Sequence, residues 1–306
     1  MAWRLTDNLD ALLAASGNHL RADPVLHTVP LTVLATLQHA GPTAFGDSPP
    51  LFGWHESADG GTDGVFFQTP PFPIMIASMP PASAESLLDV LAAIRPAPIT
   101  VNVASSDQDP VLAAWAARTG GPATARMRSR LFKLEVLTAP EPMPPGTARV
   151  ADSGDRDLLV DWNAAFSRET GTGYPEHAAR RVDDALSHHG FMLWETGGEP
   201  VALAGMTREV VGVVRVMAVY TPPGHRQRGY AGAVTTAVSQ AALAAGAAAV
   251  VLFTDLANPT SNALYQRLGY RPIADRVVLD LTTAERDGRD VTSEPVAPSE
   301  TAVSRP

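Results

Sequence analysis

Apolar positions along this chain fall into short, β-branched runs separated by segments with helical spacing. In the second half, the alternation of strand-like and helix-like segments predicts an α/β (α+β) domain with a mixed central sheet flanked by helices. Two glycines at 197–198 predict a hairpin turn. The strands are predicted at 147–151, 191–194, 201–208, 213–220, 248–253 and 276–281, and the helices at 155–170, 176–188 and 231–245.

The first half repeats this order in a weaker form. A strand at 74–79, a helix at 83–94 and a strand at 99–103 match the later strand, helix and strand at 216–221, 231–245 and 250–253. Asp109-Pro110 is followed eleven residues later by Gly120, and Asn258-Pro259 is followed eleven residues later by Gly269. We therefore expect an internal duplication, in which the first half is a degenerate copy of the second.

A proline-rich stretch divides the chain. Residues 1–138 form the degenerate copy, 139–146 a Pro-rich linker, 147–281 the second domain, and 282–306 a polar tail without periodicity that is predicted to be disordered. The length of 306 residues agrees with two domains.

Composition excludes several classes of protein and site. No apolar run approaches the roughly 18 residues of a membrane span, and no targeting peptide is evident, so we expect a cytoplasmic protein without a membrane partner. Cysteine is absent, which excludes disulfides and thiolate metal sites, and His188-His189 lacks metal-ligand spacing. The formal charge of −9 argues against nucleic acid. Alanine, glycine, proline and arginine are abundant and Lys133 is the single lysine, which indicates a GC-rich bacterial source.

The stretch from Tyr220 to Ala231 joins the predicted strand 213–220 to an alanine-rich helix. It contains Arg226-x-x-Gly229-x-Ala231. A helix start carries unpaired backbone N–H groups and the positive end of the helix dipole, and small residues let a bulky anion approach them. This turn is therefore expected to hold a pyrophosphate by its backbone.

A second block follows the next strand: Asn258-Pro-Thr-Ser-Asn-Ala-Leu-Tyr265-Gln-Arg-Leu-Gly269-Tyr270. Together the two blocks resemble the acyl-coenzyme A signature and the downstream element of the GNAT superfamily of N-acyltransferases. The resemblance covers about residues 147–281. In the first half the signature turn is absent and Ala116 stands where Tyr265 stands in the second, so the first copy is not expected to bind coenzyme A at its equivalent site.

The resemblance implies an enzyme that uses acetyl-coenzyme A as co-substrate and transfers the acetyl group to an amine by direct attack in a ternary complex. Tyr265 is the implied general acid, since a phenol stays protonated at neutral pH and can donate to a leaving thiolate. The implied cofactor-binding residues are Val219, Tyr220, Thr221, Arg226, Gln227, Arg228, Gly229, Tyr230, Ala231 and Asn258.

The general base stays open. Glu169, Glu209, Asp255 and His177 are candidates, and removal of the proton through a water chain is equally acceptable.

The acceptor is also not fixed by the sequence. We expect a small amine or amino-acid-like molecule that enters near residues 166–177 and 206–215. The alternatives are a protein acetyltransferase acting on lysine or N-terminal amines, and a non-catalytic coenzyme A-binding regulatory module. The first copy is expected to cover one side of the active site or to supply a homodimer interface.

Overall fold

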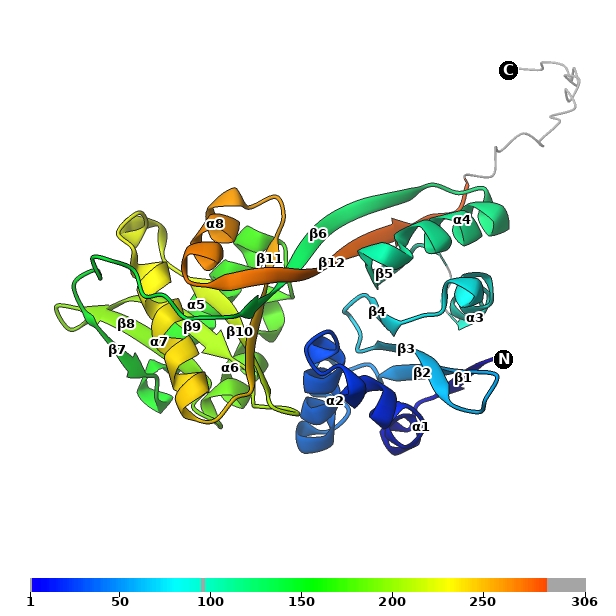
Figure 1. The fold of residues 1–306 in the computed structure, drawn as a ribbon, viewed down its shortest axis with the longest axis horizontal. Helices are drawn as coiled ribbons and strands as arrows, with labels where there is room; N and C mark the ends of the chain where they lie inside the picture. The colour runs from blue at the N-terminus through cyan, green and yellow to red at the C-terminus, as the bar shows by residue number, and fades with distance from the viewer. Residues whose placement is uncertain (1, 95–96, 285–306) are drawn as a thin grey trace, which may run out of the picture.

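The computed structural model describes residues 2–94 and 97–284 (Figure 1). Most of the predicted disordered tail, residues 285–306, lies outside the described residues. No helix in the described ranges is long and apolar enough to cross a membrane.

The described residues form one 12-stranded mixed sheet flanked by helices, as predicted for the fold class. The strands are β1 (Trp3–Thr6), β2 (Leu51–Glu56), β3 (Thr62–Gln68), β4 (Ile74–Ser78), β5 (Ile99–Ala104), β6 (Ala123–Leu134), β7 (Thr147–Val150), β8 (Phe191–Thr196), β9 (Glu199–Met206), β10 (Val213–Tyr220), β11 (Ala249–Asp255) and β12 (Tyr270–Leu281). The helices are α1 (Leu9–Ala22), α2 (Thr28–Ala40), α3 (Ala84–Ile94), α4 (Gln108–Thr119), α5 (Arg156–Thr170), α6 (Ala178–Leu186), α7 (Tyr230–Ala244) and α8 (Pro259–Arg267).

The strand order shows the duplication. It reads β1-β2-β3-β4-β5-β12-β6-β11-β10-β9-β8-β7, so each strand of the first half has its counterpart six strands later at the mirrored place in the sheet. Parallel pairing occurs between β4 and β5 and again between β10 and β11. Gly120 and Gly269 follow the equivalent helices α4 and α8 with φ of 62° and 96°, in the left-handed region that favours glycine.

The last strands of the two halves are exchanged, which the sequence pattern did not predict. β12 pairs with β5 of the first half, and β6 pairs with β11 of the second. The two exchanged strands also pair with each other along most of their length, and Figure 1 shows them crossing together between the halves. Each sequence copy therefore completes the sheet of the other, and the linker at 139–146 divides the chain without dividing the sheet.

Each exchanged strand is buried in the core of the opposite half. Val277, Leu279 and Leu281 of β12 pack in the core of the first half with Leu87 and Trp115, which are fully buried. In return, Phe132 and Leu134 of β6 pack in the core of the second half, beside Val234 and Tyr270. Each buried apolar side chain of this size contributes roughly 1.5–3 kcal/mol to stability, so the exchanged strands bind the halves together.

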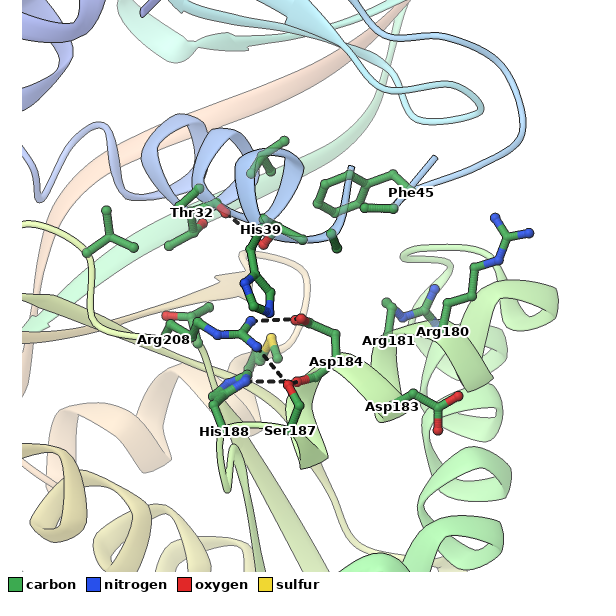
Figure 2. A pocket seen from close by; sticks show the side chains of 18 of the residues that line it. Thr32, His39, Phe45, Arg180, Arg181, Asp183, Asp184, Ser187, His188 and Arg208 are labelled. Carbon is green, nitrogen blue, oxygen red and sulfur yellow. Dashed lines mark hydrogen bonds and ion pairs between the residues drawn. The ribbon is translucent and has the colours of Figure 1, made fainter. Parts of the chain in front are cut away.

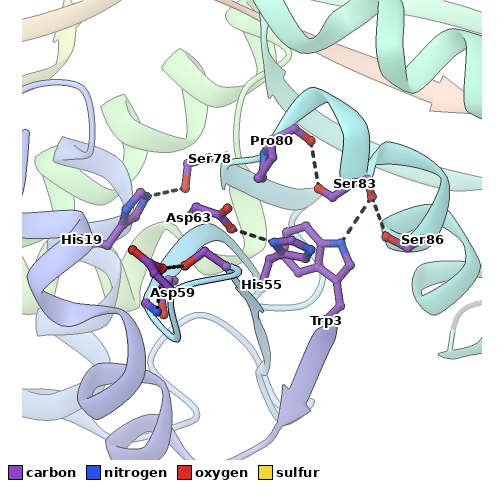
Figure 3. Close-up of polar contacts among 12 residues, drawn as sticks. Trp3, His19, His55, Asp59, Asp63, Ser78, Pro80, Ser83 and Ser86 are labelled. Carbon is purple, nitrogen blue, oxygen red and sulfur yellow. Dashed lines mark hydrogen bonds and ion pairs between the residues drawn. The ribbon is translucent and has the colours of Figure 1, made fainter. Parts of the chain in front are cut away.

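In the first half, the turn that follows β4 is filled by its own chain. Trp3 of β1 is 8% exposed and its indole N–H donates to the carbonyl of Ser83 at 3.3 Å (Figure 3). Beside it His55 Nδ1 lies 2.6 Å from a carboxylate oxygen of Asp63.

Candidate active site

The site is built where β10 and β11 separate. Their parallel pairing runs from Val213–Ala249 to Val216–Leu252, although both strands continue beyond it. At this point β10 has an irregularity in its pairing with β9, between Met217 and Tyr220. Ala218 within it has a φ of 51°, an uncommon value for a residue with a side chain. Such a bulge bends the strand and increases its twist, which directs residues 218–220 away from β11.

The turn after β10 leads into α7 with an open helix start. Gly229 is the N-cap of α7 with a φ of 83°, and no side chain of the described residues caps the helix. Gln227, two residues earlier, also has a positive φ, of 62°. Because no side-chain acceptor satisfies the first N–H groups of this 15-residue helix, they and the helix dipole remain available to an anion.

A cavity of about 960 Å³ opens between the separated strands and the turn. This is at the upper end of the roughly 300–1,000 Å³ range of ligand pockets. All but one of the predicted site residues line it; Arg228 does not. The lining members are Val219, Tyr220, Thr221, Arg226, Gln227, Gly229, Tyr230, Ala231, Asn258 and Tyr265.

Tyr265 lies on α8 with its ring buried to 7% exposure. It packs edge-on against Tyr270, with ring centroids 6.1 Å apart. Burial, and secondarily the neighbouring Tyr270, raise the pKa of Tyr265 above its ordinary value. Within the described ranges no residue hydrogen-bonds to its hydroxyl, so the phenol is a protonated donor without a protein partner.

Two buried polar atoms on the cavity wall also lack a protein partner. Thr221 Oγ1 and His225 Nδ1 make no hydrogen bond with any described residue, and both residues line the cavity. Unsatisfied buried polar atoms cost about 1–3 kcal/mol each, so their presence points to a polar ligand there. Together with the open start of α7, they fit a ligand with amide and phosphate groups, such as an acyl-coenzyme A.

Arg226 is tied to the wall of the cavity rather than left free. Its guanidinium donates to the carbonyl of Thr221 at 2.9 Å and to Glu169 at 2.6 Å, and it lies over the ring of Tyr220. The Tyr220 hydroxyl donates to Glu169 as well, at 3.1 Å, and burial raises the pKa of Tyr220. Arg226 therefore anchors the turn to β10 and α5.

Asn258 has a structural task besides lining the cavity. Its side-chain oxygen accepts the backbone N–H of Ser261 at 3.0 Å and caps α8. The cap fixes the start of the helix that carries Tyr265.

The candidate bases separate into two groups. Glu169 and Asp255 line the cavity, whereas Glu209 and His177 do not line it in the described part of the chain. Glu209 instead accepts the backbone N–H of Gly212 in the turn before β10. Asp255 accepts the N–H of Ala257 at 2.8 Å.

The far end of the cavity is formed by residues that the motifs did not indicate. They come from the first half and from the exchanged strand β12: Val29, Met75, Asn102, Met127, Ser129 and Arg276. The sequence gives one sign of these residues: Arg276, like Arg215 of β10, is a charged residue within an otherwise apolar strand. The first half therefore covers one side of this cavity, which is one of the two roles expected for it.

A second cavity, of about 650 Å³, lies between α2 of the first half and α6 of the second (Figure 2). Arg208 crosses its wall and donates to Asp184 at 2.7 Å and to Ser187 at 2.7 Å. Arg215 and Met217 line both cavities, so the two meet at β10, just before the strands separate. Residues 207, 208, 210 and 215 of the predicted acceptor entrance line this second cavity.

Comparison with protein families matches residues 157–270 to the model described as the acetyltransferase (GNAT) family. These residues include both motif blocks and most of the elements that build the cavity. The second half of the chain therefore carries a GNAT acetyltransferase domain, and the chain is an acyltransferase of this type. No curated protein sequence matches the chain.

Solved structures are similar along nearly the whole chain. A Drosophila protein from a structural genomics consortium has a TM-score of 0.65 and 15% identity, covering 92% of this chain and 98% of its own. A GCN5-related N-acetyltransferase from Kribbella flavida has a TM-score of 0.54 and 20% identity, covering 84% and 97%. A tandem GNAT protein from the clavulanic acid biosynthesis pathway has a TM-score of 0.54 and 12% identity, covering 90% and 97%. At these identities the likeness shows the fold, which is GNAT-like in both halves.

Proposed function

We propose that this protein, whose residues 157–270 form a GNAT-family acetyltransferase domain, transfers an acetyl group from acetyl-coenzyme A to the amine of a small molecule. The cavity between β10 and β11 carries this proposal, because it joins an open helix start to a buried tyrosine hydroxyl without a partner among the described residues. Acetyl-coenzyme A supplies an activated thioester when bound.

The residues of the turn take the binding role in this proposal. The N–H groups of Gly229, Tyr230 and Ala231 hold the pyrophosphate at the start of α7. Thr221 Oγ1 and His225 Nδ1 offer hydrogen bonds to the polar groups of the pantetheine arm. The backbone of Val219, where β10 leaves β11, provides an N–H for the thioester carbonyl, and one such donor typically contributes about 3 kcal/mol to rate acceleration.

Tyr265 holds the proton that the leaving thiolate takes up. In the overall step a bond forms between the amine nitrogen and the acetyl carbon, and the bond between that carbon and sulfur breaks. The amine proton leaves to solvent or to a carboxylate, and the thiolate takes the tyrosine proton. Glu169 and Asp255 are the carboxylates in reach of the cavity, and water can serve instead.

A small acceptor is supported by the way the first half covers one side of the site. Met75, Asn102 and Met127 line the cavity there, and the second cavity between α2 and α6 meets it at Arg215 and Met217. A protein chain presenting a lysine needs an open groove. We therefore favour a small molecule over a protein acceptor.

A thiol-release assay tests the proposal directly. Purified protein with acetyl-coenzyme A and a panel of amines, amino acids and aminoglycosides is expected to release coenzyme A with one class of acceptor. Binding of acetyl-coenzyme A without turnover on any member would favour a non-catalytic module. Absence of binding would remove the proposed role of the turn.

Arg226 and the neighbouring Arg228 offer a matched pair of variants. Arg226→Ala is expected to raise the KM for acetyl-coenzyme A about tenfold, because the turn loses its bonds to the Thr221 carbonyl and to Glu169. Arg228→Ala removes the same charge from a residue outside the cavity lining and is expected to change KM about threefold or less. Equal effects would mean that general positive charge, and not the anchoring of the turn, governs binding.

A further inference from the structure

Three of the four arginines that line the large cavity form no ion pair with any carboxylate of the described residues: Arg215 of β10, Arg267 of α8 and Arg276 of β12. Arg267 is exposed, whereas Arg215 and Arg276 are largely withdrawn from water. By contrast, Arg226 on the same cavity wall is paired with Glu169. A charge removed from water is normally paired, so two unpaired ones at one site need an explanation.

Arg215 lies at the junction of the two cavities and lines both. Within the described ranges its guanidinium makes one hydrogen bond, to Thr28 Oγ1 at 3.3 Å, at the start of α2. Burial without an opposing carboxylate lowers the pKa of Arg215 to about 10, which still leaves it charged at neutral pH. Most of its five N–H donors therefore remain free for a ligand.

Arg276 lies on the exchanged strand and is 9% exposed. It is held in place by Asn102 Oδ1 at 2.8 Å and by the carbonyls of Ile76 at 2.7 Å and Asn102 at 3.0 Å, all neutral acceptors. Burial lowers the pKa of Arg276 to about 10 against the opposing effect of Asp107, and the charge persists at neutral pH. Because its position depends on first-half residues, this cation exists in the site only through the strand exchange.

The charges of the lining are divided unequally. Four arginines line the large cavity, against the two carboxylates of Glu169 and Asp255. Glu169 is taken by Arg226 and Tyr220 beside the cofactor turn. Among the described lining residues, the far end, with Arg215, Arg276, Asn102 and Ser129, contains no carboxylate, and Asp107 acts on Arg276 from outside the lining. α2 also begins here, with Val29 on the cavity wall and no side-chain cap, so its dipole adds positive potential.

We propose that Arg215 and Arg276 bind an anionic group of the acceptor, so that the substrates of this enzyme are amines that also carry a carboxylate or a phosphate. This proposal rests on the acetyl-transfer function proposed above and names its substrate class. Arginine suits the role because its planar fork binds both oxygens of a carboxylate or phosphate.

Arg215 lies on β10 four residues before Val219, whose backbone is proposed to hold the thioester carbonyl. The proposed anion site and the reacting centre therefore lie along the same strand. The two cations also lower the pKa of the nearby ammonium group by charge repulsion, which favours the neutral amine that attacks the thioester.

The test compares acceptors that differ only in the anionic group. Each L-amino acid is assayed beside its α-amide, and phosphoethanolamine beside ethanolamine, by thiol release from acetyl-coenzyme A. In at least one pair of acceptors, the anionic member is expected to have about a 100-fold higher kcat/KM. The uncharged member lacks one buried, charge-assisted interaction with arginine, and a loss of this kind has about this effect. A preference confined to phosphoethanolamine would identify the anion as a phosphate, and one confined to amino acids as a carboxylate.

Arg215→Met keeps the length and apolar stem of the side chain and removes the charge. It is expected to abolish the preference, with kcat/KM falling about 100-fold for the anionic acceptor and less than threefold for the uncharged one. Arg156→Met is the control. Arg156 is an exposed residue of α5 that pairs with Asp183 of α6 and lines neither cavity, so this variant is expected to keep the preference for the anionic acceptor.

A binding measurement separates failure of this inference from failure of the proposed function. Thermal stabilisation is measured with N-acetyl amino acids and with their amides in the presence of coenzyme A. Turnover of amines without any preference for the anionic member overturns the inference and leaves acetyl transfer intact. Absence of turnover, together with no stabilisation by any anionic compound, counts against both. Stabilisation by the acids alone that disappears in Arg215→Met supports the anion site even without turnover.

Discussion

Replacing Tyr265 by phenylalanine is expected to lower kcat about 100-fold or more while leaving the KM for acetyl-coenzyme A within about twofold. General acid catalysis of this kind typically contributes 10²–10⁴-fold. The ring stays in place because its packing against Tyr270 and the core of the second half does not depend on the hydroxyl. The raised pKa of Tyr265 has a further consequence. Since the acid acts in its protonated form, raising its pKa extends that form to higher pH, so wild-type kcat should not fall near pH 10 through loss of this proton.

Tyr270→Phe is the matched control. Tyr270 is also buried, lies against Tyr265, and its hydroxyl bonds Ser239 Oγ at 2.7 Å outside the cavity lining. Its loss is expected to reduce stability by about 1 kcal/mol and to leave kcat nearly unchanged. Steady-state kinetics on both variants checks the pair. If Tyr265→Phe keeps more than a third of the wild-type kcat, the thiolate takes its proton from water and Tyr265 only shapes the cavity.

The elements of the second half could be predicted from the sequence because each carries a local signal. The strand predicted at 213–220 matches β10, and the helix predicted at 231–245 differs from α7 by one residue at each end. The glycines at 229 and 269 also have the positive φ that their places in the motifs require. Periodicity and turn chemistry act over a few residues, which is why they can be read from the chain alone.

The strand exchange could not be predicted in this way. β6 and β12 occupy equivalent places in the two copies, and local sequence patterns do not specify which copy's sheet each strand joins. The choice is set by which cores Phe132 and Val277 enter once the chain is folded, and this is a property of tertiary packing.

The charge of the site also could not be predicted from the net charge of the chain. The whole chain has a formal charge of −9, which taken alone favours a cationic acceptor. The cavity nevertheless gathers Arg215 and Arg276 from strands that are distant in sequence, and neither forms an ion pair within the described part of the chain. Net charge governs long-range attraction, whereas the acceptor site is set by the few charges buried around it.

The second large effect is expected at Gly269, where the two halves cross. This residue follows α8 with a φ of 96°, and a Cβ added to it would overlap the carbonyl of Val136. The chain there is fixed by bonds from the N–H of Glu135 to the Gly269 carbonyl and from the N–H of Thr138 to the Leu268 carbonyl. Gly269→Ala must therefore displace the backbone that leads from the exchanged strand β6 into the linker. The expected loss in the free energy of unfolding is about 3–5 kcal/mol.

Gly246→Ala separates the backbone strain of a positive φ from the steric overlap with Val136. Gly246 follows α7 with a φ of 98°, nearly the same as that of Gly269, but a Cβ there meets no atom within 4 Å. Its substitution carries the backbone strain alone and is expected to cost about 1 kcal/mol. Urea unfolding of both variants beside the wild-type protein gives the comparison. A clear excess for Gly269→Ala means that the crossing segment is held rigidly against α8. Equal losses in the free energy of unfolding would show that the crossing segment moves to accommodate the added methyl group. The halves would then be held together by the buried faces of β6 and β12 alone.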